Sequence, residues 1–168
     1  MKVTMDTLDR KKGELQGLMV LMASLSHGLE QMLGRAASTI TFRAGRAVGL
    51  KADVEKKSTD PIEALSLLQG EMLKHGIAWP FEPWKPSAAS DLVERRDGKR
   101  AVKLVFRHCM VRCALFRYSH EQKQSLCLMN HGLLCGYFQK ITGKRAELDV
   151  LHAGENACLK ELVWEESP

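Results

Sequence analysis

The chain has 168 residues, of which 45% are hydrophobic and 27% charged, and its net charge is +5 at pH 7. This balance is ordinary for one globular domain with a single core, and it argues against a disordered or fibrous chain. The basic residues are dispersed, without a compact stripe interleaved with aromatic residues, so the sequence does not support nucleic-acid binding.

The N-terminal sequence MKVTMDTLDRKKGE has no apolar segment of the kind found in a signal peptide. The most apolar window, residues 15–33, is interrupted by several polar side chains and is too polar to span a bilayer. We therefore expect a cytoplasmic protein without a membrane span. The chain is predicted to form a single domain over residues 1–168.

Residues 6–34 are predicted to form one long helix. Its apolar residues are spaced alternately three and four apart, as in the seam of two packed helices; they are Leu15, Leu18, Met22, Leu25, Leu29 and Met32. Such a seam packs either inside a helical bundle or against the same helix of a second copy. We interpret residues 1–35 as a homodimerisation segment, with packing inside one chain as the alternative.

Two further helices are predicted over residues 36–76. The first covers 36–57 and contains Gly45 and Gly49, four residues apart. Each glycine costs a helix about 1 kcal/mol relative to alanine, so the pair indicates close approach of another backbone or a ligand, or else a weak helix. The next helix has Asp60 as its N-cap, Pro61 as its first residue and Gly76 just after its end.

Residues 77–90 contain three prolines and are predicted to form a loop or an edge segment. The dipeptide Asp97-Gly98 then indicates a hairpin that joins residues 91–96 to residues 99–106. Residues 91–168 are the half of the chain that carries the cysteines, and this hairpin is its first part.

One more helix and two strands complete the chain. Ser119 and Gln122 have the spacing of a capping box, which predicts a helix that ends at Gly143. Strands are predicted at 146–151 and 157–164. The order of elements, with hairpins instead of crossover connections, predicts an α+β fold. In it, N-terminal helices pack on an antiparallel sheet of two hairpins that flank one long helix.

The chain has five cysteines, and none forms a CxxC pair. Sites rich in thiolates with some imidazole suit zinc or an iron–sulfur cluster. Candidate metal ligands are therefore Cys109, Cys113, Cys127 and Cys158, with His131 or His152. The alternative is that these cysteines are small buried apolar residues. Cys135 is the weakest candidate, because it lies two helical turns beyond Cys127. No residue stands out as catalytic.

The segments LGRAASTITFRAGRAVGLKAD (33–53) and HGLLCGYFQKITGKRAELDVLHAGENACLKELVW (131–164) resemble the two signatures of the 4-vinyl reductase, or hydrocarbon-binding, domain superfamily. The resemblance implies an α+β fold shared with vesicle-tethering and nitric-oxide-sensing haem domains. It also implies a homodimer and an apolar ligand pocket between helices and sheet. The candidate pocket residues are Phe42, Gly45, Gly49, Gly136 and Phe138.

The cysteine spacing is also similar to that in the sensory half of methanogen-output and iron–sulfur regulators. This resemblance implies Cys113, Cys127 and Cys158 as metal ligands. The chain departs from the pattern at Ala114, where proline is expected, and at Val150, where zinc-binding members carry another cysteine.

Three hypotheses for the function follow. The first is a small-molecule-sensing or redox-sensing module that acts through a protein partner. The second is an enzyme or enzyme accessory of the 4-vinyl reductase type, for tetrapyrrole reduction or thiazoline-type hydrolysis. The third is a structural dimeric adaptor.

Overall fold

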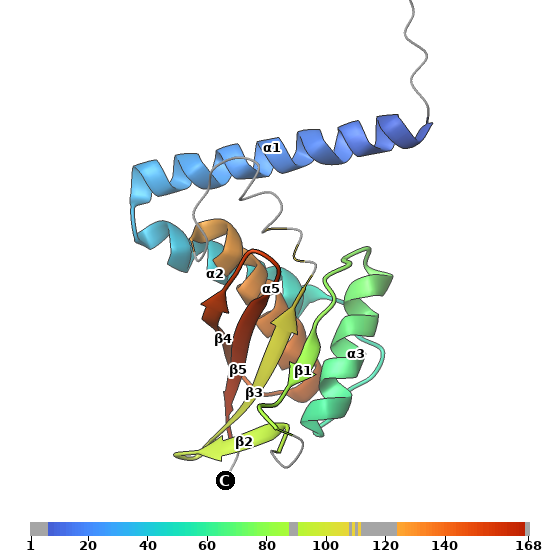
Figure 1. The fold of residues 1–168 in the computed structure, drawn as a ribbon, viewed down its shortest axis with the longest axis vertical. Coiled ribbons are helices and arrows are strands. Elements are labelled where there is room, and N and C mark those ends of the chain that lie inside the picture. Colours follow the sequence, from blue (N-terminus) through green and yellow to red (C-terminus); the bar gives the residue numbers. More distant parts are fainter. Residues whose placement is uncertain (1–6, 88–90, 108, 110, 112–123, 167–168) are drawn as a thin grey trace, which may run out of the picture.

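The computed structural model describes residues 7–87, 91–107, 109, 111 and 124–166, and its fold is α+β (Figure 1). This confirms the predicted class. In chain order the elements are α1 (Thr7–Leu33), α2 (Ala36–Lys51), α3 (Pro61–Lys74), β1 (Glu82–Trp84), β2 (Val93–Arg96), β3 (Lys99–Phe106), α5 (Ser125–Thr142), β4 (Ala146–Ala153) and β5 (Cys158–Glu165).

The sheet is antiparallel and is organised around β3. Along one side β3 pairs with β5 over its full length, with Lys99 opposite Glu165 and Phe106 opposite Cys158. Along the other side it pairs first with β2 and then with β1, while β4 pairs with the far side of β5. The predicted hairpins are thus β2–β3 and β4–β5. β1 is an edge strand within the proline-rich segment, where a missing N–H is tolerated.

The local turn and cap predictions are confirmed. Asp60 is extended and its side chain accepts a hydrogen bond from the Glu63 N–H at 2.7 Å, with Pro61 as the first helical residue. Asp97 and Gly98 both have positive φ, 50° and 75°, which is the conformation that a two-residue hairpin turn requires.

Two helix boundaries differ from the prediction. α2 ends at Lys51 and not at residue 57, because Ala52 is already extended with ψ 138°. α5 begins at Ser125 and not at Ser119, because Gln124 is extended, with φ −91° and ψ −167°. The predicted capping box of Ser119 and Gln122 lies outside the described residues.

α2 and α5 cross with their backbones in contact, and glycine makes this possible. A Cβ on Gly136 would lie 2.5 Å from the carbonyl oxygen of Arg46 and 2.9 Å from the Cα of Gly49. Gly132 faces the carbonyl of Phe42 in the same way, and Gly45 faces that of Met129. The close approach predicted from the glycine spacing is therefore an approach between two helix backbones.

The hydrophobic core lies between the sheet and the helices α3 and α5. α5 is buried on several sides because it contacts α2, α3 and β4. Its inward residues Leu134, Phe138 and Ile141 pack with apolar residues of the strands. This placement explains why the helix is apolar around much of its circumference.

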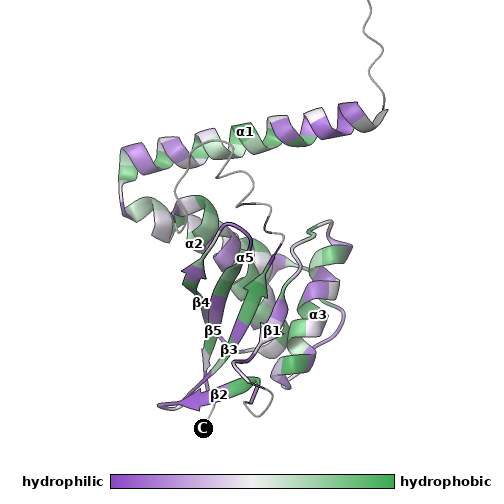
Figure 2. Ribbon diagram, in the orientation of Figure 1, coloured by the Kyte–Doolittle hydropathy of each residue, from purple (hydrophilic) through white to green (hydrophobic). Residues whose placement is uncertain are grey.

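α1 extends away from the sheet and contacts α2 and α5 (Figure 1). Large apolar side chains remain exposed along it. Hydrophobic and hydrophilic residues alternate along its ribbon in Figure 2. Leu18 and Leu25, for example, are each 56% exposed. None of the described helices has the length and apolarity that crossing a lipid bilayer requires.

Candidate functional site

The interior of the protein contains a lysine. Lys160 lies on β5, opposite Leu104 of β3 and Val150 of β4, and only 2% of its surface is exposed. The alternation of β5 explains its position, because it shares the buried face of the strand with Leu162 and Trp164. A buried amine is costly unless its N–H groups are paired, so its neighbours are of functional interest.

The amine of Lys160 contacts the imidazole of His131, a fully buried residue of α5. The distance from Nζ to Nε2 is 2.8 Å. Burial lowers the pKa of His131 to about 3, with a further contribution from the charge of Lys160, so the imidazole is neutral at neutral pH. Since an ammonium group can only donate, Nε2 accepts from it and the ring proton lies on Nδ1.

The second ring nitrogen of His131 has no good partner. Nδ1 makes no hydrogen bond of ordinary geometry with any of the described residues. The backbone of Leu148 in β4 lies near enough to raise the pKa of His131, but this is the weakest of the three influences. Nδ1 is therefore a donor directed toward β4 without a proper hydrogen bond.

Two aromatic rings enclose the amine. Nζ of Lys160 lies 4.8 Å from the ring centre of Trp79, which precedes β1, and 4.7 Å from that of Phe106 at the end of β3. The two rings contact each other, with centroids 4.7 Å apart. The indole N–H of Trp79 is buried and has no hydrogen-bond partner among the residues that the structure describes. The amine is therefore held in an aromatic environment beside a second unpaired donor.

Burial lowers the pKa of Lys160, and nearby cysteines oppose this effect because negative charge on sulfur favours the ammonium form. All four described cysteines have this influence, namely Cys109, Cys127, Cys158 and Cys135. They come from three parts of the chain: the segment after β3, α5 and the start of β5. We call Lys160, His131, Trp79 and Phe106 the lysine cluster.

The predicted metal ligands are only partly brought together. Cys109, Cys127 and Cys158 lie around the lysine cluster, and His131 is part of it. His152 is exposed and pairs with Leu159, on the opposite face of β5 from Lys160. Cys113 lies outside the described residues. Among the residues that are described, no three His, Cys, Asp or Glu side chains form a metal-binding group. These residues alone do not fit a metal ion, and an amine lies among them.

The predicted pocket residues have packing partners. Gly45, Gly49 and Gly136 form the crossing of α2 and α5, and Phe42 packs against the core from α2. Phe138 is buried with its ring centre 5.2 Å from that of Trp164. A ligand contact at these residues stays a prediction.

The sequence analysis missed Lys160 and Trp79. The signal for Lys160 was available, since CLKELVW alternates and places residue 160 on the same face as the apolar residues 162 and 164. No comparable local signal marks Trp79, whose position depends on how the segment after α3 packs.

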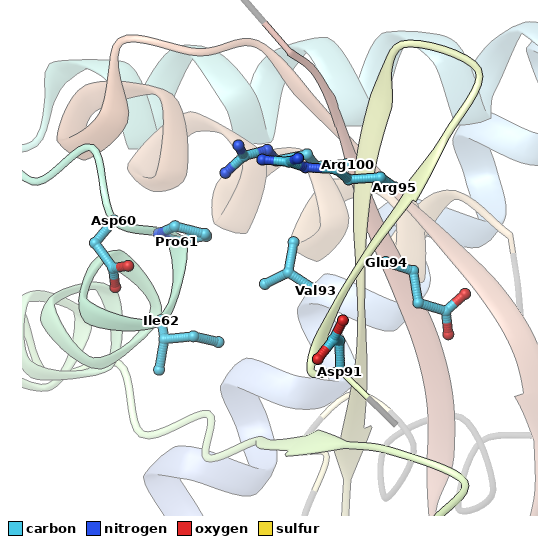
Figure 3. A pocket seen from close by; sticks show the side chains of 8 residues that line it. All are labelled: Asp60, Pro61, Ile62, Asp91, Val93, Glu94, Arg95 and Arg100. Atoms are coloured by element: carbon cyan, nitrogen blue, oxygen red, sulfur yellow. The ribbon is translucent and has the colours of Figure 1, made fainter. Parts of the chain in front are cut away.

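An open surface pocket of about 820 Å³ lies elsewhere, between the start of α3 and the β2–β3 hairpin. Figure 3 shows Arg95 and Arg100 extending in the same direction within it. Both arginines pair with Glu166, and Glu94 pairs with Lys103. Because these lining charges are already paired, the pocket is a weaker candidate than the lysine cluster.

The lysine cluster is linked to α1 through the first turn of α5. The carboxylate of Glu30 accepts a hydrogen bond from the backbone N–H of Ser125, and the hydroxyls of Ser26 and Ser125 are 2.5 Å apart. Ser26 and Ser125 are both buried. His131 lies less than two turns further along the same helix. A movement of α5 at the lysine cluster would therefore displace Ser125, the residue to which α1 is attached.

Comparison with solved structures shows a fold that is already known. The crystal structure of the phenol-responsive sensory domain of the transcription activator PoxR with phenol matches with a TM-score of 0.58 and 18% sequence identity. The match covers 88% of this chain and 73% of that chain. No family model and no curated protein matches the sequence. At this level of identity the likeness establishes the α+β fold.

Proposed function

We propose that the protein is a small-molecule-sensing module, and that its ligand binds at the lysine cluster. The observation that carries the proposal is the buried Lys160–His131 pair, with an indole N–H on the adjacent Trp79 that no described residue pairs with. The fold it shares with a phenol-responsive sensory domain supports the same class of function. We propose no catalytic residue.

The physical argument is that the lysine cluster is unfavourable without a partner. A buried amine and an unpaired buried N–H each reduce stability, by about 1–3 kcal/mol for a neutral donor and by more for a charged one. In a core of this size, apolar residues could occupy the positions of both Lys160 and Trp79. Polar groups retained at such a cost in an interior are typical of a ligand-binding site.

The test is ligand binding to the purified chain. Phenol, toluene and benzoate serve as simple aromatic probes, and binding is measured by calorimetry and by the shift in unfolding temperature. We expect saturable binding of at least one probe, which Trp79→Ala weakens and the exposed substitution Trp84→Ala does not. Saturable binding that neither variant affects would place the site elsewhere, and absence of binding would argue against the function.

We also propose that the protein is a homodimer formed through α1. Four of the six residues of the predicted seam are exposed on α1, namely Leu15, Leu18, Leu25 and Met32, and the other two, Met22 and Leu29, are half-buried. A seam of this spacing is self-complementary, so a second copy is the partner it fits best. Light scattering should give the mass of a dimer, and Leu18→Lys with Leu25→Lys should give a folded monomer.

The last part of this proposal is a protein partner whose binding depends on the position of α1. The hydrogen bonds of Glu30 and Ser26 to Ser125 support it, because they join the helix that carries His131 to the helix that presents the exposed seam. A chain that binds none of the probes but dimerises through α1 would instead be a structural adaptor.

A cysteine-bound zinc ion or iron–sulfur cluster is the second candidate function. The nearness of Cys109, Cys127 and Cys158 to Lys160 favours it. A full set of ligands would need Cys113 as well. Anaerobic purification followed by elemental analysis and absorbance spectroscopy tests it. Metal that is lost in both Cys113→Ser and Cys158→Ser would support this candidate, and metal-free protein would exclude it.

A further inference from the structure

We propose that the ligand of the lysine cluster is a small carboxylate with an apolar, preferably aromatic, body, and that Lys160 binds the carboxylate group. This inference rests on the proposed function and specifies the chemistry of the ligand. It follows from which polar groups are unpaired in the cluster, from the lack of a negative partner for the amine, and from the rings that surround it.

The unpaired groups of the cluster are hydrogen-bond donors. Nζ of Lys160 is 2.8 Å from Nε2 of His131, and an ammonium group that donates one hydrogen to this nitrogen has two left. The indole N–H of Trp79, whose ring lies below the same amine, is buried and unpaired within the described parts of the chain. A missing partner should therefore supply acceptors. A carboxylate is an acceptor-only group with two oxygens, whereas a phenol also brings a donor.

Lys160 has no carboxylate partner within the part of the chain that the structure describes. The titratable groups that influence its pKa there are cysteines, and burial raises the pKa of Cys135 to about 12, which keeps that thiol neutral. A bound carboxylate would supply the missing negative charge. The composition of the pair is the same whether it is described as ammonium with carboxylate or as amine with carboxylic acid. If the free amine is neutral, the ligand enters together with a proton, and the bound pair has the same composition.

The surroundings of the amine favour an apolar body on the ligand. The rings of Trp79 and Phe106 lie against Nζ, and Phe81 contacts Phe106 with ring centres 5.3 Å apart. An aromatic carboxylate could place its charged end on Lys160 and its ring among these side chains, where aromatic pairs prefer tilted or offset contacts.

The experiment compares benzoate with its neutral analogue of the same shape, benzamide, and with phenol. Binding to wild type, Lys160→Met and Trp79→Phe is measured by calorimetry, with Lys99→Met as the control for loss of an exposed lysine on β3. Lys160→Met keeps an unbranched side chain that is one atom shorter and removes a buried amine, so we expect it to fold. Circular dichroism checks this, and Trp79→Phe, which keeps the ring and removes the indole N–H, is the second test.

We expect benzoate to bind wild type and Lys99→Met equally and to bind Lys160→Met at least about tenfold more weakly, the loss expected for one charge-assisted hydrogen bond. Benzamide should bind wild type more weakly than benzoate and should be much less sensitive to Lys160→Met. In Trp79→Phe the affinity for benzoate should fall by a smaller factor.

Two results would overturn the inference in distinguishable ways. If phenol or benzamide binds at the cluster while benzoate does not, or if benzoate binds wild type and Lys160→Met equally, the ligand is not a carboxylate held by Lys160 but the sensing function stands. If no aromatic probe binds at all, both the inference and the proposed function fail.

Discussion

The carboxylate of Glu30 on α1 accepts a hydrogen bond from the backbone N–H of Ser125, the first residue of α5, at 3.0 Å. The first N–H groups of a helix have no partner within the helix, and a negative charge near them is favourable. Gln124, which precedes α5, makes no side-chain cap. The capping group therefore comes from a residue that is distant in the sequence, and this attaches α1 to the helix that carries His131.

Substitution of Glu30 should destabilise the protein. Glu30→Ala removes the acceptor from Ser125, whose N–H and hydroxyl both donate to Glu30, and we expect the free energy of unfolding to fall by about 1–2 kcal/mol. Urea unfolding followed by circular dichroism measures it. Glu14→Ala is the control, because Glu14 is exposed and pairs with Arg10 within the same helix, at 3.7 Å. Equal effects of the two substitutions would show that the contact with Ser125 contributes nothing.

Alanine should be poorly tolerated at Gly136. Its Cβ would lie 2.5 Å from the carbonyl oxygen of Arg46, so α2 and α5 would have to separate. We expect a loss of about 3 kcal/mol in the free energy of unfolding, as for an overpacked core. Thermal and urea unfolding provide the measurement.

Gly70 offers a matched control within α3. It is exposed in the helix interior, and a Cβ there would meet no atom within 4 Å. Gly70→Ala should therefore raise the free energy of unfolding by about 0.5–1 kcal/mol. A loss of stability at Gly70 similar to that at Gly136 would contradict the account of the helix crossing.

The elements predicted well from the sequence are those determined by neighbouring residues. Asp60 and Pro61 mark the start of α3, and Asp97-Gly98 marks the hairpin, because a cap or a tight turn depends on a few adjacent dihedral angles. The C-terminal end of α2 and the start of α5 were less well predicted. The conformations of Ala52 and Gln124 are not determined by strong local signals, and they depend on how the adjoining segments pack.

Acid should destabilise the protein through His131. Its pKa is about 3 in the folded state against 6.5 for the free side chain, so the unfolded chain takes up a proton first as the pH falls. Stability from this group is complete above pH 6.5 and is lost between pH 6.5 and about 3, by up to about 1.4 kcal/mol per pH unit. Lys160 from β5 and the Leu148 backbone from β4 are the groups that influence it.

The measurement is the pH dependence of the unfolding free energy, compared between wild type and His131→Gln. Glutamine keeps an acceptor for Lys160 but does not titrate, so the variant should have a shallower dependence in this range. His152→Gln changes an exposed histidine and should leave the dependence unchanged. Parallel curves for wild type and His131→Gln would contradict the assignment.

Cys135 should be the slowest cysteine to react with iodoacetamide. Burial raises its pKa to about 12 and its side chain is inaccessible, whereas Cys127 is half-buried. Since the thiolate is the reactive form, the labelling of Cys135 in the folded protein should require unfolding. Peptide mapping by mass spectrometry after timed labelling distinguishes the two residues. Rapid labelling of Cys135 at neutral pH would contradict its burial.

The candidate site was harder to predict than the fold because it combines residues from separate elements. His131 of α5 was among the predicted site residues as a metal ligand, whereas its partner in the structure is a lysine on β5. Lys160 could have been placed on the buried face from the alternation of β5. Its contact with His131 depends on the packing of α5 on the sheet, which no local pattern specifies.

The contact between α2 and α5 limits how these two helices can move relative to each other. Gly132 and Gly136 each lie against a carbonyl of α2, so a shift of α5 by one, two or three residues would drive a side chain into the α2 backbone. The two helices therefore behave as one stiff body with a fixed axial register. Under the proposed sensing function, a ligand at the lysine cluster would tilt or rotate these two helices together. α1, which is attached at Ser125, would then change its angle and would not slide along the axis of α5.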